Sequence, residues 1–168
     1  WGLTASVVYG LLLSTGILDS VSHRVVSLTL HQDLSAISIA LVALHGAVLV
    51  LDRFVQTTVF QIAVPFATEY RPVWVGVGQL AFYVMAVVYA SFYFRKRLGQ
   101  RGWRMLHYTT FLAFIGGAVH GLMAGTDTSA PWALWSYAAS IAVVVFLLVY
   151  RIAMSVARGS TRPAAERS

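Results

Sequence analysis

The sequence predicts an all-α integral membrane protein, a helical bundle with about five transmembrane helices. Of its 168 residues, 58% are hydrophobic and only 11% are charged, whereas soluble domains carry about 25% charged residues. The mean hydropathy is +0.73. The apolar residues also gather in long runs that polar stretches separate. A water-soluble core cannot hide this much apolar sequence, so we expect the bundle to lie in a lipid bilayer.

The apolar runs lie, in chain order, at about 1–20, 28–52, 72–94, 103–124 and 131–154. Each is close to the ~20 residues of α-helix that cross ~30 Å of hydrocarbon. Barrel strands are excluded because the runs are too long and lack a period of two. The intervening segment 53–71 is apolar for a loop. It is either an interfacial or re-entrant piece over the outer end of the bundle or a loop that covers apolar surface.

The basic residues predict the orientation. Ten of the 12 fall on one predicted side, namely Arg24, Arg95, Lys96, Arg97, Arg101, Arg104, Arg151, Arg158, Arg162 and Arg167. Only Arg53 and Arg71 fall on the other. Basic loops stay in the cytoplasm, so we expect the 95–104 loop and the C-terminus there, in a bacterial cytoplasmic (inner) membrane. The same rule explains the net charge of +6 without nucleic acid. Residues 1–155 are predicted to form the membrane domain, and 156–168 a disordered cytoplasmic tail.

Four of the five histidines form two pairs within apolar runs. His31 and His45 are separated by about 21 Å of helix rise, and His107 and His120 by about 20 Å. Their two runs both start inside, so His31 and His107 lie at one depth and His45 and His120 at another. One histidine from each helix at each of two depths is what two bis-histidine haems require. The chain has no cysteine, which excludes thiolate-ligated haem and iron–sulfur clusters.

Whether the two histidines of one helix lie on the same face depends on helix geometry. Fourteen residues at about 100° each return to within about 40° of the first face, but thirteen miss by about 140°. We expect a bend, a tightened turn or different imidazole rotamers to correct the second case, with Gly116 and Gly117 as candidate kink sites. The glycines beside the deeper histidines serve either close approach of a porphyrin or helix packing; they are Gly46, Gly117 and Gly121.

Other interpretations of these histidines remain open. A histidine inside a membrane often makes an interhelical hydrogen bond. A zinc site is disfavoured because the two sets lie ~20 Å apart without cysteine or a well-placed carboxylate. His23 is expected to be solvated or interfacial. The aromatic residues of the fourth run pack either against a haem or in the core; they are Trp103, Tyr108, Phe111 and Phe114.

The stretches "LHQDLSAISIALVALH" and "WRMLHYTTFLAFIGGAVHG" resemble the haem helices of the ferric-reductase-like transmembrane domain. That superfamily includes ferric reductases, NADPH oxidases and small bacterial stand-alone membrane cytochromes b. The resemblance covers about 3–155 and implies two b-type haems, an inner one on His31 and His107 and an outer one on His45 and His120. "HQD" departs from the family's usual histidine followed by arginine, which leaves Arg24, Arg101 or Arg104 to pair with haem propionates.

The chain is therefore predicted to carry electrons across the membrane from the inner to the outer haem. No GxGxxG-type phosphate loop is present, so a redox partner or a larger complex would supply the donor and acceptor. We assign no catalytic residue, and the chain would be at most the membrane component of an oxidoreductase. Two alternatives remain: a haem-bearing anchor subunit of a respiratory or photosynthetic complex, and a non-haem transporter component.

Overall fold

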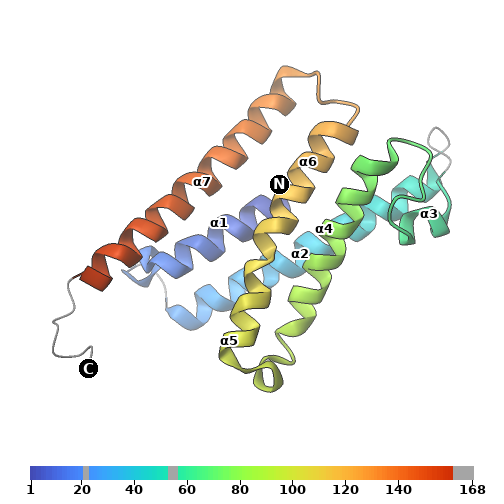
Figure 1. Cartoon of the computed structure of the whole chain (residues 1–168). Coiled ribbons are helices and arrows are strands. Elements are labelled where there is room, and N and C mark those ends of the chain that lie inside the picture. The colour runs from blue at the N-terminus through green and yellow to red at the C-terminus, as the bar shows by residue number, and fades with distance from the viewer. Residues whose placement is uncertain (21–22, 53–56, 161–168) are drawn as a thin grey trace.

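The computed structural model describes residues 1–20, 23–52 and 57–160, and every regular element within these ranges is helical (Figure 1). This confirms the predicted all-α class. The order is α1 (Gly2–Thr15), the 3₁₀ helix η1 (Ile17–Ser20), α2 (Arg24–Leu51), α3 (Val59–Ala63), α4 (Pro72–Ser91), α5 (Arg95–Tyr108), α6 (Thr110–Ala124) and α7 (Pro131–Ser160).

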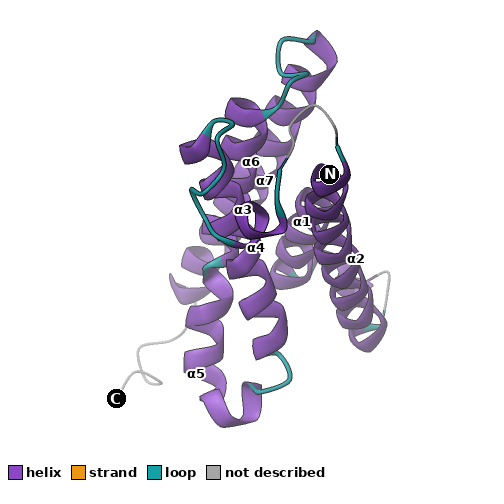
Figure 2. Cartoon of the chain, turned by 90° about the vertical axis from the view of Figure 1, so that its right-hand side faces the viewer, coloured by secondary structure: helices purple, strands orange, loops and turns teal. Residues whose placement is uncertain are grey.

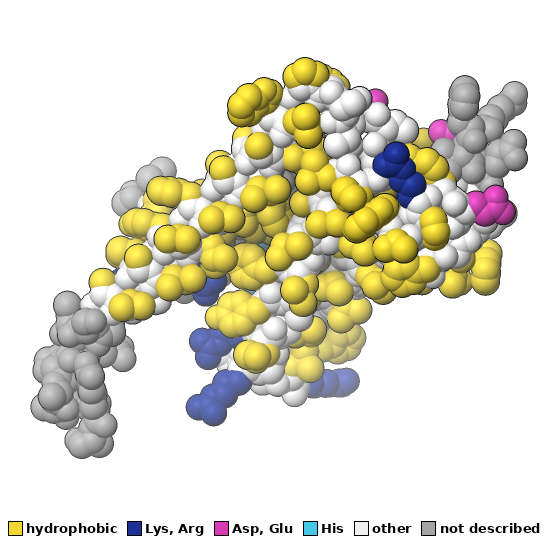
Figure 3. Space-filling model, turned by 45° about the horizontal axis from the view of Figure 1, so that its top comes forward, with side chains coloured by type: hydrophobic (Ala, Val, Ile, Leu, Met, Phe, Trp, Pro, Cys, Tyr) yellow, Lys and Arg dark blue, Asp and Glu magenta, His cyan; other side chains and the backbone are white. Residues whose placement is uncertain are grey.

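Three helices in the described ranges are long and apolar enough to cross a membrane: Val25–Leu51, Pro72–Ser91 and Pro131–Arg158. Helix α1 is apolar but shorter. Hydrophobic side chains cover much of the visible surface in Figure 3, while Lys and Arg gather mostly at one end. A membrane protein is thus supported by composition and by helix length together. Three of the five predicted spans therefore correspond to helices with the length and composition of a membrane span.

Local sequence explains several helix boundaries. Gly16 ends α1 in the left-handed conformation, with φ 78° and ψ 6°, and its N–H donates to the Leu13 carbonyl. A glycine adopts this conformation without a Cβ clash. Pro72 opens α4 at the first helical position, where its missing N–H costs no helical hydrogen bond. Helix α7 begins in the same way at Pro131.

Two clusters hold the helices together. Leu11 of α1, Phe114 of α6, and Val144 and Leu147 of α7 form the first. The second is made of Ala81 and Met85 of α4 with Ala113 of α6. Small residues let α4 and α6 approach closely, and these two helices form the most extensive contact of the bundle. Helix α1 packs on both α2 and α7, and Figure 2 shows α1 and α2 side by side along one flank.

The predicted fourth run is not one straight helix. Residues Arg95–Tyr108 form α5, but its backbone leaves the helical conformation at Gly99 (φ 69°, ψ 160°), and a break at Thr109 separates it from α6. The C-terminal boundary also differs, because α7 continues to Ser160 where a disordered tail was expected from 156. The remainder of that predicted tail, 161–168, lies outside the described residues, as does Arg53.

Segment 57–71 turns back against the bundle. The side-chain amide of Gln79 donates to the carbonyls of Gln61 and Ile62, at 2.7 Å each, and the Tyr83 hydroxyl donates to the Ala63 carbonyl. These carbonyls end the short helix α3 and have no partner within a helix of that length. Gln79 lies about 10 Å along α4 from its start. These contacts tie the segment to α4, and both interpretations of it stay predictions; residues 53–56 lie outside the described residues.

Candidate functional site

Four histidines meet as two pairs between α2 and the α5–α6 unit. The ring centres of His31 and His107 are 6.2 Å apart with an interplanar angle of 74°. Those of His45 and His120 are 6.4 Å apart at 73°. The structure thus brings together the partners that the sequence predicted at each depth. Helices α2 and α6 therefore run in the same direction.

The separation of the rings suits a single metal ion between each pair. A metal–imidazole bond is about 2.0–2.1 Å long and the ring centre lies about 1.1 Å beyond the nitrogen, so imidazoles on opposite sides of one ion have centres about 6.3 Å apart. Both observed separations lie within 0.1 Å of that value. Neither pair is in stacking or direct hydrogen-bonding contact. The spacing is therefore compatible with two imidazoles that would hold one haem iron between them.

The turn at Thr109 brings His107 and His120 onto compatible faces. The Thr109 N–H donates to the Leu106 carbonyl at 3.0 Å, three residues back rather than four. The Thr109 and Thr110 hydroxyls donate to the carbonyls of Leu106 and His107, at 2.6 and 2.7 Å. A 3₁₀ turn advances about 120° per residue rather than 100°, which makes up part of the 140° deficit.

The expected kink at Gly116 and Gly117 is wrong, because α6 runs unbroken through both residues. A Cβ added to Gly116 would lie 3.2 Å from the Ala81 side chain of α4. The glycine therefore lets α4 and α6 approach closely instead of bending α6. The tightened turn that the spacing required is present, but at the two threonines.

The outer pair is oriented by α4. Nδ1 of His120 lies 3.0 Å from the Trp74 carbonyl, and because a carbonyl can only accept, Nδ1 carries the proton. This leaves Nε2 with the lone pair that a metal needs, which is the usual support of a ligating histidine. A Cβ added to Gly78 would lie 2.5 Å from His120 Cγ and Nδ1. His45, the partner ring, is exposed.

The inner pair is less completely supported. Trp103 stacks on His107, with ring centres 5.1 Å apart and planes 26° apart. Among the described residues, Nδ1 of His31 and Nε1 of Trp103 are buried without a hydrogen-bond partner. Buried polar atoms normally have partners in the protein or in ordered water. Two orphaned atoms at one site indicate a group that enters here, and a haem with its propionates offers both acceptors and bulk. Gly10 of α1 borders this pair, since its Cβ would lie 3.0 Å from His31 Cε1.

Several further expectations are resolved by position. Gly46, Gly117 and Gly121 face Ile62, Leu3 and Tyr137 respectively, so helix packing is the favoured role for all three. The sequence analysis missed Gly10 and Gly78, which border the histidines from α1 and α4. A glycine inside an apolar run was their only signal. His23 is the exposed N-cap residue of α2, in agreement with an interfacial position.

The aromatic residues of the fourth run divide between the two expected roles. Phe114 is buried in the core cluster and Phe111 packs against it. Trp103 alone of the four contacts a site histidine in a ring stack. Tyr108 is exposed, with the Arg151 guanidinium 5.7 Å from its ring centre. Phe111 and Phe114 are thus core residues, and Trp103 is a site residue.

That Arg24, Arg101 or Arg104 pairs with haem propionates stays a prediction. Arg101 and Arg104 are exposed on α5, and the side chain of Arg24 is outside the described part. Arg151 of α7 lies beside Tyr108, the residue that follows His107. It was missed because only tertiary packing brings α7 to this point. Within the described ranges, His, Cys, Asp and Glu form no group of three or more that would hold a free metal ion. The donor set is therefore two separate imidazole pairs.

Comparison with models of known protein families, with curated proteins and with solved structures finds no match. The resemblance to the ferric-reductase-like domain therefore stays a prediction, and function is argued from the histidine geometry.

Proposed function

We propose that this chain is a transmembrane electron carrier, a di-haem b-type cytochrome of the ferric-reductase-like kind. One observation carries the proposal: two pairs of imidazoles face each other at two levels, each with the separation that a shared metal ion requires. When bound, a haem supplies one-electron chemistry at its iron. His31 and His107 would hold the inner haem, and His45 and His120 the outer one.

The residues of this chain orient and enclose the two groups. Trp74 fixes the tautomer of His120 through its carbonyl. Trp103 holds the plane of His107 by stacking. Held by an imidazole of this chain on each side, a haem would have no open coordination site for small molecules. This favours electron transfer over ligand binding.

In the proposed topology, α1 and the α5–α6 unit complete five crossings. The basic loop around α5 would face the cytoplasm of a bacterial inner membrane, with the C-terminus on the same side. Electrons would then enter near His31 and His107 and leave near His45 and His120. The described residues all belong to the bundle and its connections. Donor and acceptor must therefore come from outside them, which equally supports a haem-bearing subunit of a larger membrane complex.

Haem quantification with a reduced-minus-oxidised spectrum tests the proposal. We expect about two haems per chain, because each pair supplies both axial ligands of one iron. His31→Ala and His45→Ala should each lose one haem. His23→Ala removes an exposed histidine outside both pairs, so it should retain both haems. A purified chain without Soret absorption, or histidine variants with unchanged haem content, would refute the proposal. Co-purified redox subunits would favour the larger complex over a stand-alone carrier.

A further inference from the structure

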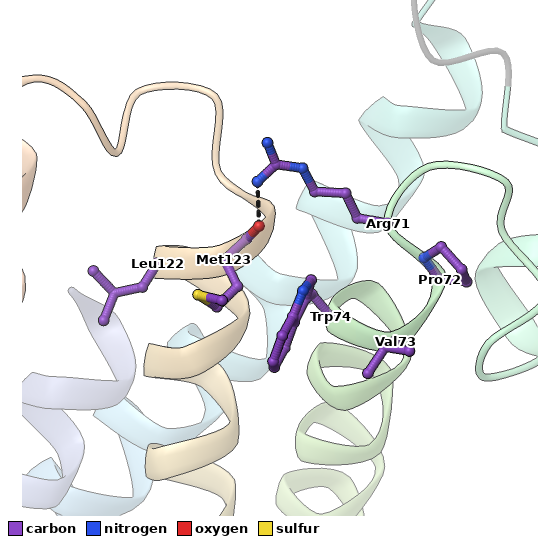
Figure 4. A pocket seen from close by; sticks show the side chains of 6 residues that line it. All are labelled: Arg71, Pro72, Val73, Trp74, Leu122 and Met123. Atoms are coloured by element: carbon purple, nitrogen blue, oxygen red, sulfur yellow. Dashed lines mark hydrogen bonds between the residues drawn. The ribbon is translucent and has the colours of Figure 1, made fainter.

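A surface pocket lies beside the outer histidine pair and has no part in the proposed electron path. It has a volume of about 340 Å³ and is lined by Arg71, Pro72, Val73, Trp74, Leu122 and Met123. Figure 4 shows these residues at the start of α4 and the end of α6, with Arg71 and Trp74 in the space between the two helices. The lining therefore combines one cation with five apolar side chains.

Arg71 is held at the rim with donors to spare. One terminal nitrogen donates to the Met123 carbonyl at the end of α6 (Figure 4). Its neighbour Tyr70 donates to the Ala124 carbonyl at 3.0 Å, which ties the same loop to the same helix end. A guanidinium has five N–H donors, so the fixed arginine can still bind an anionic oxygen. The nearby acids, Glu69 and Asp127, do not line the pocket.

The pocket also lies at the level where lipid headgroups are expected. Pro72 is the first residue of a candidate membrane span, and Trp74 is two residues further. Tryptophan is typical of the membrane–water boundary. Val73 and Met123 are 56% and 42% exposed, so apolar surface continues outward from the cation. A cation above apolar walls at this depth matches a phosphate above acyl chains.

We propose that this pocket binds an anionic phospholipid, with the phosphate on Arg71 and the upper acyl chain against Val73, Trp74 and Met123. Arginine binds phosphate oxygens in a bidentate manner, which suits this headgroup. A headgroup without its own cation is preferred because Arg71 is the one charged residue of the lining. Trp74 also holds His120, so the lipid would contact the residue that orients the outer pair. The proposal does not depend on haem.

Photo-cross-linking in nanodiscs tests it. The whole chain is placed in phosphatidylcholine nanodiscs with a small fraction of diazirine-bearing phosphatidylglycerol, or of diazirine-bearing phosphatidylcholine as the matched probe. Adducts are mapped by mass spectrometry to 71–74 and 122–123. We expect phosphatidylglycerol to label these residues about fivefold more, since one basic residue near the surface favours anionic lipid by about that factor.

Three variants locate the cause of the preference. Arg71→Gln should abolish it, while Arg71→Lys retains the charge and should keep most of it. Arg104→Gln removes an exposed arginine from α5 and should leave it unchanged. Equal labelling by the two lipids in the wild-type chain, or a preference that survives Arg71→Gln, would overturn the proposal. Loss of labelling on addition of inorganic phosphate would also overturn it, by identifying a soluble anion as the occupant.

Discussion

At the scale of single residues, each histidine pair is held by different neighbours. The His120 ring is held by the Trp74 carbonyl, which accepts from Nδ1, and by the bare backbone of Gly78, which lies against the ring. His31 has a buried Nδ1 without a partner among the described residues. His120 is therefore the better oriented of these two ligands.

Gly78→Ala should selectively weaken the outer haem site. The new Cβ would lie 2.5 Å from the His120 ring, so the ring must leave its hydrogen bond with Trp74. Loss of such an orienting partner typically costs 10–100-fold in metal affinity. Haem titration of the two sites measures this loss.

Gly117→Ala is the matched control for Gly78→Ala. Its Cβ would meet only the flexible end of Leu3, at 3.3 Å, and it lies in the same helix as His120. Both haems should be retained in this variant. Equal haem loss in the two alanine variants would contradict a specific role for Gly78.

The sequence predicted the four histidines because an ionisable side chain is conspicuous in an apolar run. It could not predict the supports, since every residue has a backbone carbonyl and a glycine in an apolar run does not reveal what it faces. Trp74 is the clearest example, because the carbonyl that orients His120 is a group that all residues share. Likewise the mutual approach of Arg151 and Tyr108 depends on how α7 packs.

At the scale of helices, the bend of the α5–α6 unit occurs at Thr109 and Thr110 rather than at the glycine pair of α6. Gly116 permits contact with Ala81 of α4, whereas Gly117 and Gly121 meet Leu3 of α1 and Tyr137 of α7; the bend occurs at Thr109 instead. Helix α4 packs against α6 at Gly116, whereas Thr109 comes before that contact in the chain. The spacing of thirteen residues predicted that a bend, a tightened turn or different imidazole rotamers would be needed. It could not predict which of these occurs or where.

Gln79→Leu should destabilise the packing of segment 57–71 against α4. The side chain has similar volume but cannot donate to the carbonyls of Gln61 and Ile62, which it now holds at 2.7 Å each. A buried polar group left without its partner costs about 1–3 kcal/mol. We expect a loss of that order in the free energy of unfolding, measured by SDS titration in mixed micelles.

A matched substitution on α5 separates this effect from a change of hydrophobicity. Gln100 is exposed, so Gln100→Leu should leave the unfolding free energy nearly unchanged. Tyr83→Phe removes one further donor, to the Ala63 carbonyl, and should produce a smaller loss than Gln79→Leu. If Gln79→Leu is as stable as the wild-type chain, α3 is not held by these bonds.

At the scale of the whole molecule, the α5–α6 unit decides how many times the chain would cross a bilayer. Three helices have the length and composition of a span, and in the proposed topology α5 and α6 would together make one further crossing across a bend. His107 lies near the end of α5 and His120 near the end of α6. They pair with His31 and His45 of the single long helix α2. Because α2 is a candidate span in its own right, the α5–α6 unit must run through the same depth.

Cysteine labelling tests this crossing directly, since the chain contains no cysteine of its own. Gln100 and Ser129 are both exposed. Gln100 lies in the first half of α5 and Ser129 lies between α6 and α7, so the end of α5 and all of α6 connect them. The five basic residues of α5 favour the cytoplasm for position 100. In intact cells a membrane-impermeant maleimide should label Ser129→Cys, and should label Gln100→Cys only after permeabilisation. Labelling of both positions from one side would mean that α5 and α6 enter and leave the membrane at the same face. The two histidine pairs could then not lie at two depths of one crossing.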